Sequence, residues 1–247
     1  MRPTTLVLFD VDGTLVDTAG AGRRALQAAF EAVHGFPDVA GRTAAVAFSG
    51  KTDPAIVAEM CAALAVSSPD AATFERAYLM ALNVEMARSD ARRRVLPGVR
   101  ELVQHLAARP DVHLGLVTGN IEAGARAKLA PFGLNPFFPT GGYGSDHADR
   151  RQVARMAAVR VAAGAGVHMD ASRVVVVGDT ELDVDCARAN GFRAVAVLTG
   201  WSTREVLQSA GPDALLQDLA DLTVTLEALG LTPAPGPSPT PRRTSPA

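Results

Sequence analysis

The chain has 247 residues, of which 48% are hydrophobic and 20% are charged, and its formal net charge at pH 7 is -2. A chain of this length can bury a sizeable core in one large or two modest domains. So small a net charge argues against strong electrostatic attraction to nucleic acid or to an acidic membrane surface. No charged segment followed by a long apolar stretch stands near residue 1, so we expect a cytoplasmic protein without a signal peptide or membrane span.

The first predicted element is an apolar strand, Leu6–Phe9, that ends in two carboxylates. Asp10 and Asp12 follow it directly, with Gly13 and Thr14 after them. Carboxylates at the end of a buried strand are costly unless a cation or hydrogen-bond donors lie close by. The end of this strand is therefore a candidate functional site.

Residues 17–93 show only helical patterns. Apolar residues recur at helical spacing over 26–33 and again over 56–64, with loops expected at 35–41 and 67–70 and no convincing strand. This stretch predicts an all-helical domain that is inserted after the first strand.

A short polar run lies between two of these predicted helices. Gly50, Lys51 and Thr52 could reach down from the insertion onto a substrate. Thr52 or Asp53 could instead cap a helix before Pro54, and both interpretations can hold together. The run is not a P-loop, because the required glycine spacing is missing.

From residue 94 onward, helices and strands alternate. The expected helices are 97–107, 121–131, 148–163, 181–189, 203–208 and 218–229, and the expected strands are 112–117, 173–177 and 193–198. Strands separated by helices indicate an α/β fold with a parallel, doubly wound sheet. We expect a core domain of residues 1–16 and 94–231, followed by a Pro-rich disordered tail at 232–247.

Two further strands also end in polar residues. One runs into Thr118, Gly119 and Asn120, and the other runs into Asp179 with Asp183 four residues later. The carboxyl ends of parallel strands lie along one edge of the sheet, where open α/β sheets bind their ligands. These residues are therefore expected to meet the two acids of the first strand.

Four acids at one sheet edge favour phosphate chemistry with a metal ion. Asp10 is the candidate nucleophile toward phosphorus, and Asp12 can protonate the leaving oxygen and later deprotonate water. Mg²⁺ prefers oxygen ligands, so Asp10, the backbone carbonyl of Asp12 and Asp179 would form a partial shell. Any one of these acids could be a helix cap, but caps do not explain all of them together without a cation.

The second polar run suits a phosphate group. The hydroxyl of Thr118 and the amides near Gly119 and Asn120 would lie at the N-terminus of the following helix. Such an end binds anions through free backbone N–H groups, although Thr118 could also cap that helix.

The five histidines show no spacing typical of zinc ligands.

The three runs Asp10–Thr14, Thr118–Asn120 and Gly178–Asp183 resemble, in this order, the motifs of the haloacid dehalogenase superfamily. The helical insertion resembles that family's C1 cap, and the match spans residues 5 to about 230. The resemblance implies a Rossmann-like core and a Mg²⁺-dependent phosphatase that forms an aspartyl phosphate. It also implies that Asp183 supports the metal without ligating it directly. Phosphoglycolate phosphatases are the most similar group, and the substrate stays open.

One residue departs from this family pattern. The family usually has a lysine, less often an arginine, between the second and last motifs, and this chain has only the two lysines Lys51 and Lys128. Lys128 is interpreted as an ordinary cation near a helix end. Arg150, where a loop turns into a helix, is the better candidate for holding the phosphoryl group, with a fork of donors in place of a point charge. Its neighbour Arg151 is expected on a solvated helix face.

Three alternatives to a phosphatase stay open. A β-phosphoglucomutase-like phosphotransferase would retain every motif, whereas a 2-haloacid dehalogenase is disfavoured because its relatives lack an acid at the position of Asp12. A receiver module that is phosphorylated on an aspartate is about half this size and has no cap. The expected partner is a small phosphorylated metabolite, without nucleic acid or membrane, and the expected assembly is a monomer or weak dimer.

Overall fold

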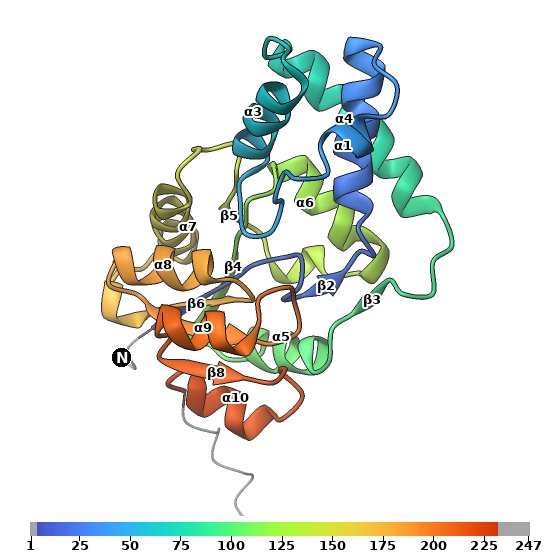
Figure 1. Ribbon diagram of the computed structural model, residues 1–247. Coiled ribbons are helices and arrows are strands. Elements are labelled where there is room, and N and C mark those ends of the chain that lie inside the picture. Colours follow the sequence, from blue (N-terminus) through green and yellow to red (C-terminus); the bar gives the residue numbers. More distant parts are fainter. Residues whose placement is uncertain (1–3, 232–247) are drawn as a thin grey trace, which may run out of the picture.

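The computed structural model describes residues 4–231, and a six-stranded sheet lies at its centre with helices on both faces (Figure 1). The strands run in the order β5-β4-β1-β6-β7-β8, and every neighbouring pair is parallel. The predicted α/β, Rossmann-like, doubly wound sheet is therefore confirmed. The tail predicted at 232–247 lies outside the described residues.

The bounds of the elements fix where each chain segment enters the sheet. The strands are β1 Thr5–Phe9, β2 Val16–Asp17, β3 Arg94–Val95, β4 Val112–Val117, β5 Gly141–Gly142, β6 Val174–Gly178, β7 Arg193–Val197 and β8 Ala214–Leu216. The α-helices are α1 Ala21–His34, α2 Val39–Arg42, α3 Asp53–Leu64, α4 Ala71–Ala87, α5 Val99–Ala107, α6 Glu122–Leu129, α7 Arg150–Ala165, α8 Glu181–Ala189, α9 Arg204–Ala210 and α10 Leu222–Ala228. Three short 3₁₀ helices are η1 Ala130–Phe132, η2 Asn135–Phe137 and η3 Ala171–Arg173. Among these helices of residues 4–231, none is long and apolar enough to cross a membrane.

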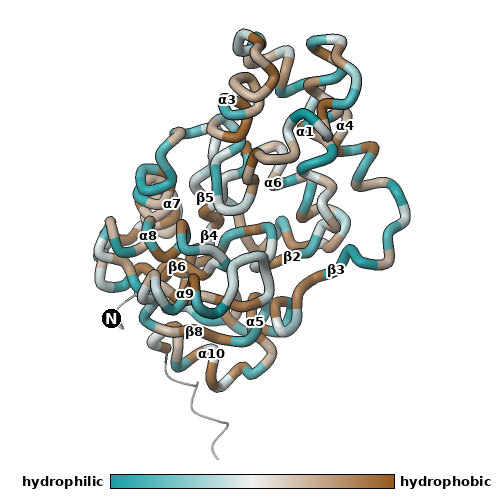
Figure 2. Tube along the Cα trace, in the orientation of Figure 1, coloured by the Kyte–Doolittle hydropathy of each residue, from teal (hydrophilic) through white to brown (hydrophobic). Residues whose placement is uncertain are grey.

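The sheet is buried on both faces. Because side chains alternate along a strand, Val7 and Phe9 of β1 pack in one core with α5, α6 and α10, whereas Leu6 and Leu8 pack in another with α7, α8 and α9. Helices on both faces explain why the strands are nearly continuous apolar runs, and these appear brown in Figure 2. Burial of the strands leaves their carboxyl ends as the polar edge of the sheet.

The helices α1 to α4 lie between β2 and β3, and we call residues 21–87 the helical insertion (Figure 1). Their own apolar core includes Phe30, Met60, Tyr78 and Leu82, and the helices α1 and α4 pack side by side. Ile121, just before α6, packs against this core. The insertion is thereby held over the end of β4, where α6 begins.

The short elements are the ones that the sequence did not predict. The strands β2 and β3 pair with each other over two residues each, and β5 consists of Gly141 and Gly142, which carry no side chains to signal a strand. The helix α2 lies in a segment predicted to be a loop, and it is a single turn capped by the side chain of Asp38. Elements this short contain too few residues to show a hydrophobic periodicity. Whether they form depends on their contacts in the folded chain.

Candidate active site

The polar ends of three adjacent strands meet at one edge of the sheet. β1 lies between β4 and β6, and Phe9 pairs with Leu116 on one side and with Val177 on the other. The strands β4 and β5 lie on one side of β1, and β6, β7 and β8 lie on the other. The carboxyl end of β1 is therefore at the topological switch point, where α/β folds bind ligands. Asp10, which follows β1, lies at the centre of the edge.

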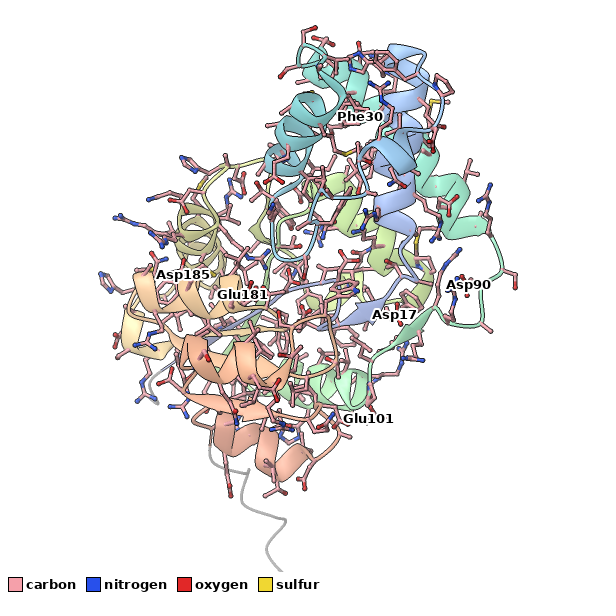
Figure 3. The ribbon with its side chains drawn as sticks, viewed as in Figure 1. Asp17, Phe30, Asp90, Glu101, Glu181 and Asp185 are labelled. Carbon is pink, nitrogen blue, oxygen red and sulfur yellow. The ribbon has the colours of Figure 1, made fainter. Side chains whose placement is uncertain are left out.

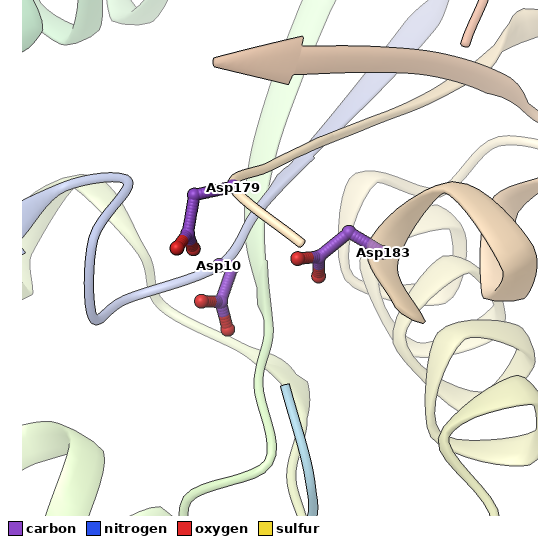
Figure 4. Close-up of side chains that lie close together, drawn as sticks. All are labelled: Asp10, Asp179 and Asp183. Atoms are coloured by element: carbon purple, nitrogen blue, oxygen red, sulfur yellow. The ribbon is translucent and has the colours of Figure 1, made fainter. Parts of the chain in front are cut away.

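Three buried carboxylates gather there (Figure 4). Asp10, Asp179 and Asp183 each offer an oxygen atom, and these atoms lie within 4.8 Å of one another. Burial raises the pKa of Asp10 to about 7, and the charges of Asp183 and Asp12 add to this against the opposing effect of Arg150. The pKa of Asp179 is also raised, first by burial and then by the charges of Asp10 and Asp183. Three carboxylates that repel one another form a suitable binding site for a cation, and a bound cation would favour their ionised forms.

A tight turn brings the loop after β1 against Asp179. Gly13 has φ +81, and a Cβ atom at this position would lie 2.5 Å from Asp179 Oδ2. Only glycine adopts this conformation without strain and leaves room for the carboxylate. Thr14 then donates from its hydroxyl to Asp179 Oδ1 over 3.3 Å, so the loop holds the acid from two sides.

The acid Asp183 belongs both to a helix end and to the cluster. Its Oδ2 accepts hydrogen bonds from the backbone N–H of Thr180, at 3.0 Å, and from the Thr180 hydroxyl, at 2.7 Å, in the capping box that starts α8. Its Oδ1 accepts a hydrogen bond from Arg150. Both oxygens of Asp183 are thus already engaged by the protein.

Arg150 is buried in the middle of this cluster. It is the first residue of α7, which Asp149 caps, and its Nη2 donates to Asp10 Oδ1 at 2.8 Å and to Asp183 Oδ1 at 2.5 Å. Arg151, one residue on, forms an exposed ion pair with Asp185, which lies on the outer side of α8 (Figure 3). The structure thus brings Arg150, and not its neighbour, to the predicted carboxylates.

The second acid of the first motif has a different cation. Asp12 Oδ2 accepts hydrogen bonds from Lys128 Nζ at 2.5 Å and from Asn120 Nδ2 at 2.9 Å, and Oδ1 accepts one from the Thr18 hydroxyl at 3.1 Å. Burial alone would raise the pKa of Asp12. The charge of Lys128 and these hydrogen bonds outweigh it, so the pKa lies below its usual value.

The interpretation of Lys128 as an ordinary cation near a helix end is wrong. Its side chain is only 6% exposed, and it lies on the face of α6 that also buries Gly124, Ala125 and Leu129. Lys128 stands four residues after Gly124 and so shares its helix face, but the sequence alone does not show that this face is buried. Lysine is rarely buried unless it is paired, as it is here with Asp12.

The predicted phosphate-binding run closes on itself in this structure. The Thr118 hydroxyl accepts hydrogen bonds from Asn120 Nδ2 at 2.8 Å and from the Asn120 backbone N–H at 3.3 Å. Asn120 Oδ1 accepts one from Lys128 Nζ at 2.5 Å. Gly119 packs directly against the backbone of Lys51, where a side chain has no room. These residues therefore lie between the first motif and the helical insertion.

The polar loop of the insertion docks on the core through a main-chain carbonyl and a side-chain hydroxyl. The Gly50 carbonyl accepts a hydrogen bond from Arg150 Nη1 at 2.9 Å, and the Thr52 hydroxyl donates to the Ala148 carbonyl at 3.1 Å. Thr52 also caps α3, so both of its predicted roles are compatible with the structure. Lys51 turns instead to Glu59 within the insertion, with Nζ and Oε1 2.6 Å apart.

Sequence reasoning named Asp53 only as a possible helix cap, and it missed Tyr78. Asp53 donates its backbone N–H to the Gly119 carbonyl at 2.7 Å and accepts from the Ile121 N–H at 2.9 Å, and burial raises its pKa to about 6. The Tyr78 hydroxyl is buried and has no hydrogen-bond partner within residues 4–231. Both lie in the insertion beside residues whose apolar spacing already indicated a helix. The sequence therefore gave no separate indication that these two side chains lie near the sheet edge.

A cavity of about 320 Å³ lies between the sheet edge and the insertion. Asp10, Asp12 and Arg150 line its core side, whereas Arg23 and Tyr78 line it from the insertion. The volume and the mixture of apolar walls with a few converging polar groups are typical of a small-molecule site.

Comparison with known proteins identifies the family and agrees with this fold. The model of the haloacid dehalogenase-like hydrolase family matches residues 7–188. The chain is 29% identical over 224 residues to a phosphoglycolate phosphatase of Mesorhizobium japonicum, covering 90% of this chain and 94% of that protein. It is 32% identical over 242 residues to that of Rhodospirillum rubrum, with coverages of 92% and 96%. A crystal structure of a predicted phosphoglycolate phosphatase from Haemophilus somnus superposes with a TM-score of 0.67 at 20% identity, covering 91% of this chain and 99% of that one.

The chain therefore belongs to the haloacid dehalogenase-like hydrolase family, as its three motifs indicated. It is an enzyme, and its relatives support a hydrolase of the phosphatase type.

Proposed function

We propose that the protein is a Mg²⁺-dependent phosphatase that hydrolyses a small phosphorylated metabolite through an aspartyl phosphate on Asp10. The observation that carries this proposal is the position of Asp10, between two further buried acids and Arg150, on the wall of a cavity of about 320 Å³. A carboxylate there can attack phosphorus and form an acyl phosphate that water readily cleaves.

Asp10 and Asp12 divide the reaction between them. As the Asp10 oxygen forms its bond to phosphorus, the ester O–P bond breaks, and the leaving oxygen keeps the electron pair and takes a proton from Asp12. Because the lowered pKa keeps Asp12 ionised in the free enzyme, that proton comes from solvent or from the substrate, whose second phosphate pKa is about 6. In the second half, water attacks phosphorus and gives a proton to Asp12, while the bond between phosphorus and the Asp10 oxygen breaks and restores the Asp10 carboxylate.

The acids at the sheet edge would hold Mg²⁺. Asp10, the backbone carbonyl of Asp12 and Asp179 are the proposed ligands, and oxygen donors of this kind suit Mg²⁺. Asp183 would support the site without ligating, since both of its oxygens already accept hydrogen bonds from Thr180 and Arg150. When bound, the ion neutralises charge on the phosphoryl oxygens as the nucleophile approaches.

Four residues would receive the phosphoryl group. Arg150 brings a fixed charge to Asp10, and Thr118, Gly119 and Asn120 supply a hydroxyl and amide groups before α6. The distribution of these donors around Asp10 would hold phosphorus in line with the attacking oxygen.

The helical insertion would act as a cap, within the predicted bounds 17–93. Its loop with Gly50, Lys51 and Thr52 lies over the core edge through the contacts of Gly50 and Thr52. Closure of such a cap excludes water until the acyl phosphate has formed. The unpartnered hydroxyl of Tyr78 and the guanidinium of Arg23 on the cavity wall would meet polar groups of the leaving part of the substrate.

A panel of phosphorylated metabolites tests this function. Phosphoglycolate is the first candidate, because the relatives from M. japonicum and R. rubrum carry that activity in their names. Release of inorganic phosphate with Mg²⁺ from at least one small monoester is the expected result. Transfer of phosphate between positions of a sugar phosphate, with none released, would replace the hydrolase by a phosphotransferase. Turnover of a 2-haloacid alone would replace it by a dehalogenase.

Replacement of Arg150 by alanine is expected to lower kcat/KM by about two to three orders of magnitude, the scale of one lost pre-organised electrostatic contact. The change removes the donor to both Asp10 and Asp183. Arg150→Lys should recover part of the loss, because the charge returns without the fork of donors.

Arg151→Ala is the matched control for this change. The side chain of Arg151 forms an exposed ion pair with Asp185, and such pairs contribute little. Steady-state kinetics with the best substrate of the panel separates the two variants. A damaged Arg151→Ala beside an active Arg150→Ala would refute the assignment of the phosphate-holding cation.

A further inference from the structure

A second buried cation, Lys128, lies at the site and serves a different carboxylate from Arg150. Lys128 extends from α6 to the cavity wall, and its Nζ lies 2.5 Å from both Asp12 Oδ2 and Asn120 Oδ1. An ammonium group has three protons to donate, so these two contacts leave one donor. Arg150 meanwhile contacts Asp10 and Asp183. Each half of the first motif therefore has its own cation.

The contacts of Asp12 fix its carboxylate in one place. Lys128 and Asn120 both donate to Oδ2, and Thr18 donates to Oδ1. These donors come from the core helix α6, from the loop after β4 and from the segment that leads into α1. A carboxylate held by three donors from separate segments has little freedom to rotate, which is a requirement for a precise proton donor.

The helical insertion holds Lys128 from its other side. Gly22 in the first turn of α1 is so close that a Cβ atom there would lie 2.8 Å from Lys128 Nζ and 3.0 Å from Cε. A Cβ contact below 3.0 Å forces the neighbouring atom to move. Even alanine at position 22 would therefore push the ammonium away from its present place beside Asp12.

We propose that Lys128 is a positioning residue for the leaving-group side of the reaction, and that Gly22 provides the space that lets it reach Asp12. This proposal rests on the proposed function, in which Asp12 gives its proton to the leaving oxygen. Lys128 holds Asp12 in line with that oxygen and keeps a positive charge beside it as the ester bond breaks. The cap thus affects proton transfer through Gly22, a residue that need not touch the substrate itself.

A comparison of substrates with different leaving groups tests this role of Lys128. An alkyl monoester has a poorly stabilised leaving oxygen that needs the proton, whereas p-nitrophenyl phosphate leaves with little help. Lys128→Met should therefore reduce kcat/KM for an alkyl ester, such as phosphoglycolate or glycerol phosphate, by about a hundredfold. The loss with p-nitrophenyl phosphate should be about tenfold or less, so that the alkyl-to-aryl ratio falls.

Gly22→Ala tests the same geometry with Lys128 still present. The helical backbone at this position accepts alanine, so the variant should fold and should lower the alkyl-to-aryl ratio in the same direction by a smaller factor. Gly164→Ala is the matched control, since Gly164 lies inside α7 and, within residues 4–231, no atom beyond the neighbouring residues and the nearby backbone of this helix lies within 4 Å of the added Cβ. It should leave both rates unchanged.

The outcomes distinguish this proposal from the function on which it rests. A wild-type protein that hydrolyses neither ester would overturn both. If the wild type hydrolyses both esters and the Lys128→Met variant loses them equally, or loses neither, only the role of Lys128 is refuted. Should Lys128→Met fail to fold, an unchanged ratio in Gly22→Ala refutes the role on its own.

Discussion

Replacement of Asp10 by asparagine is expected to reduce phosphatase activity by at least about three orders of magnitude. The amide has nearly the shape of the carboxylate, but it carries no charge and cannot form the acyl phosphate. Asp10 is buried at the centre of the sheet edge, 2.8 Å from Arg150. Phosphate release from the best ester of the panel measures the effect.

Asp185→Asn is the control for this change. It neutralises an acid of α8 that forms an exposed ion pair with Arg151, so the activity of this variant should equal that of the wild type. Circular dichroism and the melting temperature establish that both variants are folded. More than a tenth of the wild-type rate in folded Asp10→Asn protein would refute Asp10 as the nucleophile.

Removal of divalent metal is expected to abolish turnover, again by about three orders of magnitude, and added Mg²⁺ should restore it. Without a cation, the charges of Asp10, Asp179 and Asp183 repel one another within 4.8 Å. Ca²⁺ should inhibit, because its larger and looser shell misplaces the nucleophile. Undiminished activity after exhaustive chelation would contradict the proposed metal site.

The same acids predict how pH changes the stabilising effect of the metal. The pKa of Asp10 rises from 3.8 to about 7 in the folded, metal-free chain. The folded state therefore binds more protons than the unfolded state between these values, and stability that is present below pH 4 is lost as the pH rises toward 7. Mg²⁺ should thus raise the melting temperature more at pH 8 than at pH 5.5, and an equal shift at both would be the contrary result.

The main features of the site could be predicted because the sheet edge is encoded locally. An apolar run that stops at Asp10, and another that stops before Asp179, can be recognised without knowledge of the partners, and the parallel sheet then brings them together. Arg150 was identified because the family pattern requires a lysine or arginine between the second and last motifs, and Arg150 stands in that interval. In these cases, a few residues that are adjacent in the sequence determine the position of a side chain.

Lys128, Asp53 and Tyr78 illustrate why the rest could not be predicted. Each lies on a helix or helix end whose local pattern has an ordinary explanation, and the partners of Lys128 and Asp53 come from segments far away in the sequence. The pair of Lys128 with Asp12 spans 116 residues, and that of Asp53 with Ile121 spans 68. Pairing of β1 with β4 in the sheet brings α6 and Lys128 to Asp12, whereas docking of the insertion on the core brings Asp53 to Ile121.

The docking of the insertion loop through backbone atoms has a consequence for how the enzyme's preferences can change. The contacts of the Gly50 carbonyl with Arg150 and of the Asp53 N–H with the Gly119 carbonyl involve no side chain of the loop. If this loop faces the substrate as proposed, a mutation at Lys51 would alter what the loop presents to it while leaving these two backbone contacts unchanged. The loop can acquire new selectivity one substitution at a time, and the reactive centre beneath it need not be rebuilt at any step.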